Sequence, residues 1–206
     1  MLINLSLLIL ALATALLLRP WRMMAGALHL TPLLATLTVL PWLWALPSLH
    51  KMPLQLQGSG ACLVVLMLGW PLAVPVLCGV GLLAWLISPM PWDTALDLTV
   101  WLGVVPATLA MLLGAAIRRW IGTYLFVFIF ARAFIGSALC VFAAGLLAQL
   151  VGHSMPGIDD GVSLIAHWLL AWGDAFLTGM FTAIMIAFKP AWLATWSDQL
   201  YLAKPK

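Results

Sequence analysis

The apolar stretch ACLVVLMLGWPLAVPVLCGVGLLAWLIS, residues 61–88, decides the fold of this chain. It is too long for one straight membrane-spanning helix and too short for two complete ones. The sequence Gly69-Trp70-Pro71 interrupts it, and Pro75 follows about one turn later. We therefore predict two short helices folded around this break, inside a bundle of longer apolar helices.

The composition places this bundle in a membrane. Of the 206 residues, 65% are hydrophobic and 7% are charged, and the mean hydropathy is +1.15. A soluble domain of this size leaves much of its surface in water and cannot carry so much apolar surface. The net charge of +3 is small, and the Lys and Arg residues form no dense cluster. The lipid bilayer is the expected environment, and nucleic acid is not an expected partner.

Seven predicted membrane-spanning segments cover most of the chain. The predicted fold class is therefore an all-α polytopic helix bundle, with residues 1–206 as a single transmembrane domain. The approximate bounds are 2–18, 23–47, 55–69, 71–88, 95–117, 121–152 and 162–188, followed by a tail at 189–206. With seven segments most of the basic residues share one side, namely Arg19, Arg22, Arg118, Arg119, Lys189, Lys204 and Lys206, whereas Lys51 lies on the outer side against the rule. The positive-inside rule then places the N-terminus outside and the tail in the cytoplasm.

An aspartate, Asp174, lies near the middle of the last apolar segment, where a bare carboxylate is costly. It follows His167 by seven residues, so the two share one helix face, with Thr178 one turn further along. Arg132 lies at a depth that matches Asp174 on the neighbouring segment. An Arg132–Asp174 ion pair that holds the bundle together and a ligand or transport role for Asp174 are both open interpretations.

Two more histidines enter the predicted metal site. His29 lies in the second segment near a proline, and His50 lies in the loop after it. A lone histidine is more often a hydrogen-bonded core residue than a ligand. If a metal binds, the expected imidazole donors are His29, His50 and His167, with Asp174 as a carboxylate donor or as a hydrogen-bond acceptor behind them.

Two further ionisable residues have plain structural interpretations. Asp97 follows the predicted start of the fifth segment closely, where a carboxylate stabilises the first turn of a helix. His153 lies in the polar outer loop at residues 152–161 and is expected to be solvated.

Three segments carry a family resemblance. GDAFLTGMFTAIMIAFKPAWLATWSDQLYL (residues 173–202), GACLVVLMLGW (60–70) and YLFVFIFARAFIGSAL (124–139) resemble segments of the CbiM-like membrane proteins. Those proteins are the substrate-binding or permease subunits of energy-coupling factor transporters for cobalt and nickel. In the first segment Asp174 stands in place of the family's glutamate and Thr178 in place of its asparagine. The resemblance implies a seven-helix fold with the N-terminus outside.

The chain also departs from the family at three positions. The family holds its metal through a Met-His start and a loop histidine, whereas this chain has Leu2 and, in the best alignment, Gln57. Arg132 occupies the position of an asparagine in the middle motif. A neutral amide and a guanidinium cation are poor replacements for imidazole in a site for a divalent metal ion.

The resemblance implies a substrate-binding or permease component for a transition metal ion in the bacterial inner membrane. The metal is then the substrate, and no intrinsic cofactor is expected. The chain has no Walker A sequence, so ATPase and transmembrane coupling subunits are the implied partners. The departures leave open a non-transporting assembly subunit that has lost its metal site. An enzyme is not expected, because no nucleophile or second aspartate can be placed beside Asp174.

Overall fold

The computed structural model describes residues 2–21, 29–50, 57–153 and 160–201, and within these ranges it contains helices and no strands. The predicted all-α class is confirmed for this part of the chain. Parts of two predicted segments, residues 23–28 and 55–56, and the end of the predicted tail, residues 202–206, lie outside the described residues.

Five of the described helices are long and apolar enough to cross a membrane. They are α2 (Leu30–Leu49), α4 (Trp70–Ile87), a continuous helix Trp92–Trp120, a continuous helix Val127–Leu150, and α8 (Asp160–Phe188). The first helix, α1 (Leu2–Leu17), is apolar but has 16 residues, which rise only about 24 Å. These long apolar helices are consistent with a multi-pass membrane protein.

Two of the long helices contain π-helical turns. The helix Trp92–Trp120 consists of α5 (Trp92–Asp97), the π-helical η2 (Leu98–Val104) and α6 (Val105–Trp120). The helix Val127–Leu150 consists of the π-helical η3 (Val127–Ile135) and α7 (Gly136–Leu150). A π-helical turn holds more residues than an α-helical turn, so it changes which side chains face the bundle interior.

The predicted break at Gly69 is confirmed, but only the helix before it is short: α4, predicted as a second short helix, has 18 residues and continues through Pro71 and Pro75. Gly69 has φ +74° and separates the short α3 (Ala61–Leu68) from α4. The helix predicted for residues 55–69 begins only at Ala61, because Gln57–Gly60 are not helical. Gly60 has φ +63°, a left-handed conformation that L-residues with a side chain disfavour. The eight residues of α3 rise about 12 Å, less than half of a hydrocarbon core of about 30 Å.

The end of α2 also differs from the prediction. The predicted segment ends at Pro47, whereas α2 continues through Pro41 and Pro47 to Leu49. Each proline removes one backbone hydrogen bond, and helices within membranes tolerate this loss when their neighbours support them.

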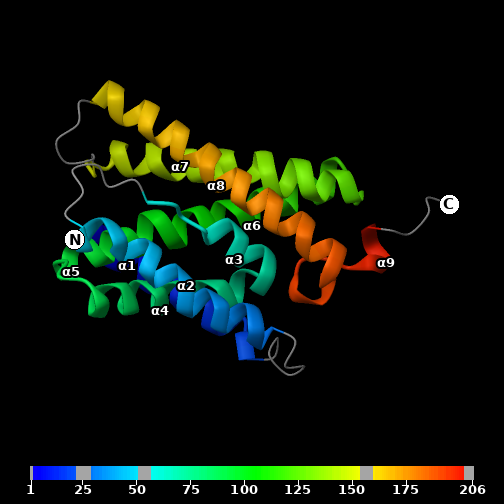
Figure 1. The fold of residues 1–206 in the computed structure, drawn as a ribbon, viewed down its shortest axis with the longest axis horizontal. Helices are drawn as coiled ribbons and strands as arrows, with labels where there is room; N and C mark the ends of the chain where they lie inside the picture. The colour runs from blue at the N-terminus through cyan, green and yellow to red at the C-terminus, as the bar shows by residue number, and fades with distance from the viewer. Residues whose placement is uncertain (1, 22–28, 51–56, 154–159, 202–206) are drawn as a thin grey trace.

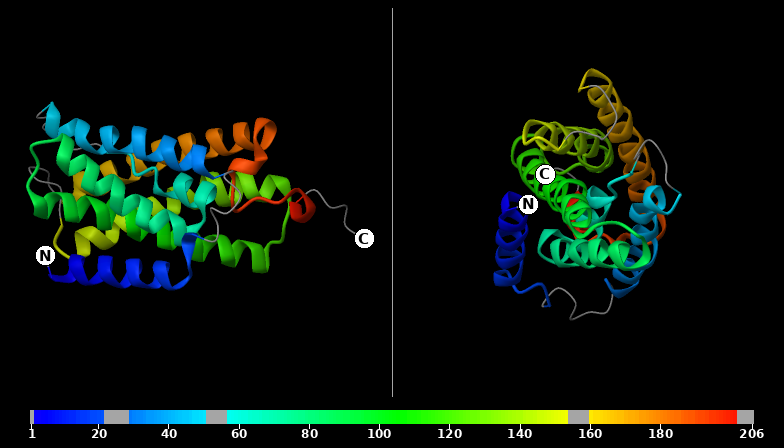
Figure 2. Two further views of the ribbon diagram at one scale, coloured as in Figure 1. Left: turned by 90° about the horizontal axis from the view of Figure 1, so that it is seen from below. Right: turned by 90° about the vertical axis from the view of Figure 1, so that its left-hand side faces the viewer.

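The long helices run in alternating directions along the bundle (Figures 1 and 2). α1, α6 and α8 run the same way, so Arg19, Arg118, Arg119 and Lys189 all follow or close helices at one end of the bundle. The stretch Gln57–Gly60 and α3 together lead from the end of the bundle where α2 finishes toward the end where α4 begins (Figure 1).

The short α3 lies at the centre of the bundle. It packs on α2, α4, α6 and α8, and all of its residues except Leu63 are buried. Non-helical backbone such as Gln57–Gly60 is tolerated at membrane depth only when protein surrounds it. The central position of α3 therefore explains how a broken helix can exist in this bundle.

After α8 the tail forms η4 (Pro190–Trp192) and α9 (Asp198–Tyr201). Leu193, Trp196 and Tyr201 are buried against Phe128 of η3 and the core around α3. The tail is thus packed into one end of the bundle.

Candidate functional site

The first turn of α3 is held by Asp174 of α8. The Gly60 N–H donates a hydrogen bond to Oδ1 of Asp174 at 2.9 Å. The first N–H groups of a helix have no partner within the helix and carry partial positive charge, so a carboxylate at this place is favourable. This contact explains why an aspartate lies in the middle of the last apolar helix: it caps a broken helix within the bundle.

The tail holds the other end of α3. The N–H groups of Ala194 and Thr195 donate to the carbonyls of Met67 and Leu66, at 3.0 and 3.3 Å. The Thr195 hydroxyl also donates to the Leu66 carbonyl, at 2.9 Å. The last carbonyls of a helix need such partners from outside the helix. Both ends of α3 are therefore capped by the C-terminal part of the chain.

The stretch Gln57–Gly60 separates two cavities. Gln57 and Ser59 line a cavity of about 460 Å³, which we call the polar cavity. Gly58 and Gly60 line a second one of about 300 Å³ between α2 and α8, which we call the apolar cavity. Alternate residues of this stretch thus line different cavities.

The polar cavity lies among η2, α7, α8 and the stretch before α3. Its lining includes ionisable and hydrogen-bonding side chains: Gln57, Ser59, Thr94, Asp97, Trp101, His153 and His167. Apolar residues of η2, α6, α7 and α8 complete the wall. A concave site with mostly apolar walls and a few polar groups is typical of small-molecule binding sites.

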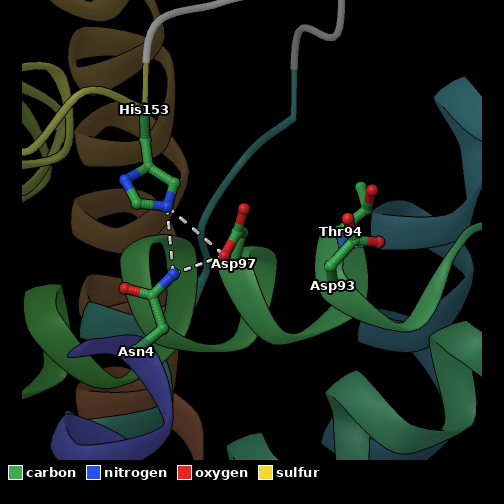
Figure 3. Close-up of polar contacts among 5 residues, drawn as sticks. All are labelled: Asn4, Asp93, Thr94, Asp97 and His153. Carbon is green, nitrogen blue, oxygen red and sulfur yellow. Dashed lines mark hydrogen bonds and ion pairs between the residues drawn. The ribbon is translucent and has the colours of Figure 1, made fainter. Parts of the chain in front are cut away.

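Three residues from distant parts of the chain meet at one side of this cavity (Figure 3). The Asn4 amide donates a hydrogen bond to Oδ1 of Asp97 and lies 3.0 Å from Nε2 of His153. His153 Nε2 and Asp97 Oδ1 are 3.4 Å apart. An amide carries two hydrogens, so Asn4 can donate one to each neighbour. In this arrangement Nε2 of His153 is an acceptor and its Nδ1 carries the proton.

Gln57 and Ser59 already have partners for their donors. Gln57 donates to the Trp44 carbonyl at 3.0 Å, and the Ser59 hydroxyl donates to the Leu102 carbonyl at 2.6 Å. These bonds fix the extended stretch against α2 and η2. The side chain of Gln57 thus has a structural role.

Three nitrogens of the cavity lining are buried without a hydrogen-bond partner among the described residues. They are Nε1 of Trp101, Nδ1 of His153 and Nε2 of His167. Buried polar groups are costly unless they find a partner. Each of these three nitrogens is covered by the surrounding protein.

The predicted metal ligands are not brought together. His29 and His50 flank α2 at its two ends, about 30 Å apart along its 20 residues. His167 lines the polar cavity and Asp174 lines the apolar one. Within the described part of the chain, no three or more His, Cys, Asp or Glu side chains form a group that could hold a metal ion.

The predicted Arg132–Asp174 ion pair is not formed between these two described residues. The Arg132 guanidinium lies over the Phe128 ring, 5.2 Å from its centroid, and interacts with the Tyr201 hydroxyl. It also lies directly against Gly114 of α6. The two side chains thus have separate neighbours, Asp174 at the first turn of α3 and Arg132 beside the tail.

Sequence reasoning missed Asn4, Trp101, Asp97 and His153 as members of a site. Asp97 ends α5 instead of standing in its first turn, which Asp93 occupies. Asn4 and His153 are separated by 149 positions, so no local pattern links them. A polar residue so early in an apolar helix was the one available signal for Asn4.

Comparison with protein-family models, with curated proteins and with solved structures finds no match to this chain. The polar cavity and its side chains are therefore the basis for a functional proposal.

Proposed function

We propose that this chain is the membrane-embedded substrate-binding or permease component of an energy-coupled transporter, and that its substrate contains a transition metal ion. The observation that carries the proposal is the polar cavity of about 460 Å³, whose lining includes Asp97, Trp101, His153 and His167. The proposed setting is the bacterial inner membrane, with ATPase and transmembrane coupling subunits as partners.

The proposed topology has seven crossings with the N-terminus outside. The basic residues at the helix ends support it, because Arg19, Arg118, Arg119 and Lys189 gather at one end of the bundle, which becomes the cytoplasmic end. The polar cavity, which contains Asp97 and His153 from the other end, then opens on the outer side. In this topology Gln57–Gly60 and α3 together make one crossing.

Within the cavity, His167 is the proposed nitrogen ligand. Its Nε2 is unpartnered, and neutral imidazole is a common ligand of transition metal ions. α7 packs closely against this ring at Gly145. A Cβ built on Gly145 would lie 2.6 Å from Nδ1 of His167. The carboxylate of Asp97 on the same cavity compensates part of the charge of a cation.

The test is equilibrium binding of Co²⁺, Ni²⁺, Cu²⁺ and Zn²⁺ species to the purified chain in detergent. We expect His167→Ala to weaken binding by at least about tenfold, or roughly 1.4 kcal/mol. Gly145→Ala should weaken binding too, because its methyl group displaces the His167 ring. His50→Ala is the matched control, since the His50 side chain is exposed and lies outside the cavity. Equal affinities for the wild type and all three variants would contradict the assignment of His167 as a metal ligand.

A second candidate is a non-transporting assembly subunit on the same fold. Two observations favour it: the hydrogen bond that engages Gln57 with Trp44, and the lack of a group of three or more metal ligands among the described residues. Purification in a mild detergent separates the candidates. Co-purified ATPase and coupling subunits support transport, and a stable complex with other membrane proteins supports assembly.

A further inference from the structure

The apolar cavity opens on the outer surface of the bundle, between two helices that are long and apolar enough to cross a membrane, α2 and α8. Its lining includes exposed side chains of both helices, namely Val39, Leu43, Leu177 and Phe181. The short α3, which packs on both helices, forms its floor. In a bilayer this opening faces hydrocarbon.

The polar side chains that line this cavity are already engaged or covered. The Thr36 hydroxyl donates to the Pro32 carbonyl at 2.8 Å. Oδ1 of Asp174 accepts a hydrogen bond from the Gly60 N–H, and Oδ2 is covered by the surrounding protein. Thr178 is buried. A molecule in this cavity therefore meets hydrocarbon on nearly all sides, so the part of it that enters must be apolar.

The length of the cavity matches one leaflet of a membrane. The part of α8 that lines it, from Asp174 to Met185, rises roughly 16 Å. One leaflet contributes about 15 Å to a hydrocarbon core of about 30 Å. Asp174 lies near the middle of α8 and Met185 lies near its end. The cavity therefore covers the depth of a single leaflet, the one at the end of the bundle where Lys189 follows α8.

The volume of about 300 Å³ fits one hydrocarbon chain. A chain that keeps about 4.5 Å from its neighbours occupies on the order of 250 Å³ over this length. A helix about 10 Å wide would need on the order of 1,200 Å³ over the same length. The cavity thus has the dimensions of an acyl chain and is too small for a helix of a partner or of a second copy.

A basic residue lies at the leaflet surface beside this cavity. The backbone N–H of Lys189 donates to the Met185 carbonyl at 2.7 Å, so Lys189 lies one turn beyond the cavity lining. Its side chain is exposed and forms no ion pair with another described residue. An exposed lysine at the level of the lipid headgroups attracts anionic lipids.

We propose that the apolar cavity binds one acyl chain of an anionic phospholipid, whose headgroup pairs with Lys189. The chain covers the lipid-facing side of α3 and of Gly58 and Gly60, so that the non-helical backbone before α3 is enclosed at membrane depth. This inference does not depend on the proposed function, because it concerns the cavity on the other side of the wall formed by Gln57–Gly60.

Native mass spectrometry of the full chain in detergent tests the proposal with two added lipids, dioleoyl phosphatidylglycerol and dioleoyl phosphatidylcholine. The two lipids have the same acyl chains, and only the first carries a net negative charge. We expect the wild type to retain one phosphatidylglycerol, bound at least about fivefold more tightly than phosphatidylcholine. Lys189→Gln should still bind one lipid and should lose this preference.

A tryptophan placed in the cavity tests its position. Ala35→Trp fills the cavity from an exposed position on α2, and Thr38→Trp is the matched control, because Thr38 is exposed on the same helix and does not line the cavity. We expect Ala35→Trp to lose at least about tenfold in affinity for phosphatidylglycerol, and Thr38→Trp to bind as the wild type does. Val39→Trp provides a second cavity-filling variant if Ala35→Trp does not fold.

Three results would overturn the proposal. Unchanged affinity for phosphatidylglycerol in both cavity-filling variants would exclude the apolar cavity as the site. Equal affinity of the wild type for the two lipids, or a preference that Lys189→Gln retains, would exclude the headgroup contact with Lys189. A dimer of the wild type that retains no lipid and that Ala35→Trp dissociates would show that a second copy covers the cavity instead.

Discussion

The Gly60 N–H donates a hydrogen bond to Oδ1 of Asp174, at 2.9 Å, across 114 positions of sequence. This bond joins the last long helix to the start of a short helix at the centre of the bundle. The stretch that ends at Gly60 also forms the wall between the two cavities. Asp174 thus acts on the polar cavity from the opposite side of that wall, by holding its backbone in place.

The first prediction concerns this bond. Asp174→Leu leaves the Gly60 N–H buried without a partner, which should lower the free energy of unfolding by about 1–3 kcal/mol. Asp174→Asn keeps an acceptor oxygen at the same place and should cost less. Unfolding of both variants in mixed detergent micelles measures the difference. Equal losses for the two variants would show that the hydrogen bond does not stabilise the fold.

A double-mutant cycle tests whether Arg132 and Asp174 interact. Because the structure gives them separate neighbours, the losses from Arg132→Gln and Asp174→Asn should add to within about 0.5 kcal/mol. The same unfolding measurement applied to both single variants and the double variant gives the interaction energy. An interaction energy well above about 1 kcal/mol would instead support an ion pair between Arg132 and Asp174.

Gly81 of α4 and Thr99 of η2 lie too close for a methyl group between them. A Cβ built on Gly81 lies 1.9 Å from the Thr99 hydroxyl oxygen, so Gly81→Ala should cost about 1–3 kcal/mol through overpacking. Gly173→Ala is the matched control, because nothing lies within 4 Å of its added methyl group. The Gly173→Ala variant should have an unchanged free energy of unfolding, or one raised by up to about 1 kcal/mol. Thermal unfolding of the pair tests the packing of α4 on η2, and similar behaviour of both variants would count against it.

The tail provides the fourth prediction. Thr195→Val removes the hydroxyl that donates to the Leu66 carbonyl and should destabilise the protein by about 1 kcal/mol. It should also speed proteolysis of the tail, because one of the bonds that hold the tail on α3 is lost. Gln199→Ala, at an exposed position of α9, serves as the control. Identical digestion of the two variants would argue against this attachment.

Much of the fold could be predicted from the sequence. The long apolar runs gave the positions of α2, α4 and α8, because hydrophobic length is a strong signal in membrane proteins. The break at Gly69 was also predictable, since Gly followed by Trp-Pro disfavours a continuous helix. The π-helical turns at Leu98–Val104 and Val127–Ile135 were not, because they change the helical period that sequence reasoning assumes.

The candidate site was predicted only in part. His167 was expected as a site residue, and it lines the polar cavity. An ion pair with Arg132 was one of two open interpretations of Asp174, because only side chains carry a sequence signal, whereas its partner is a backbone N–H. The contacts among Asn4, Asp97 and His153 depend on how distant segments pack, which one sequence cannot specify.

Anomalous X-ray diffraction from crystals grown with Ni²⁺ shows directly whether the polar cavity binds a metal ion. We expect one anomalous peak inside the polar cavity, within bonding distance of the His167 imidazole. An empty polar cavity, or nickel bound only at another place such as the His29 end of α2, would contradict it.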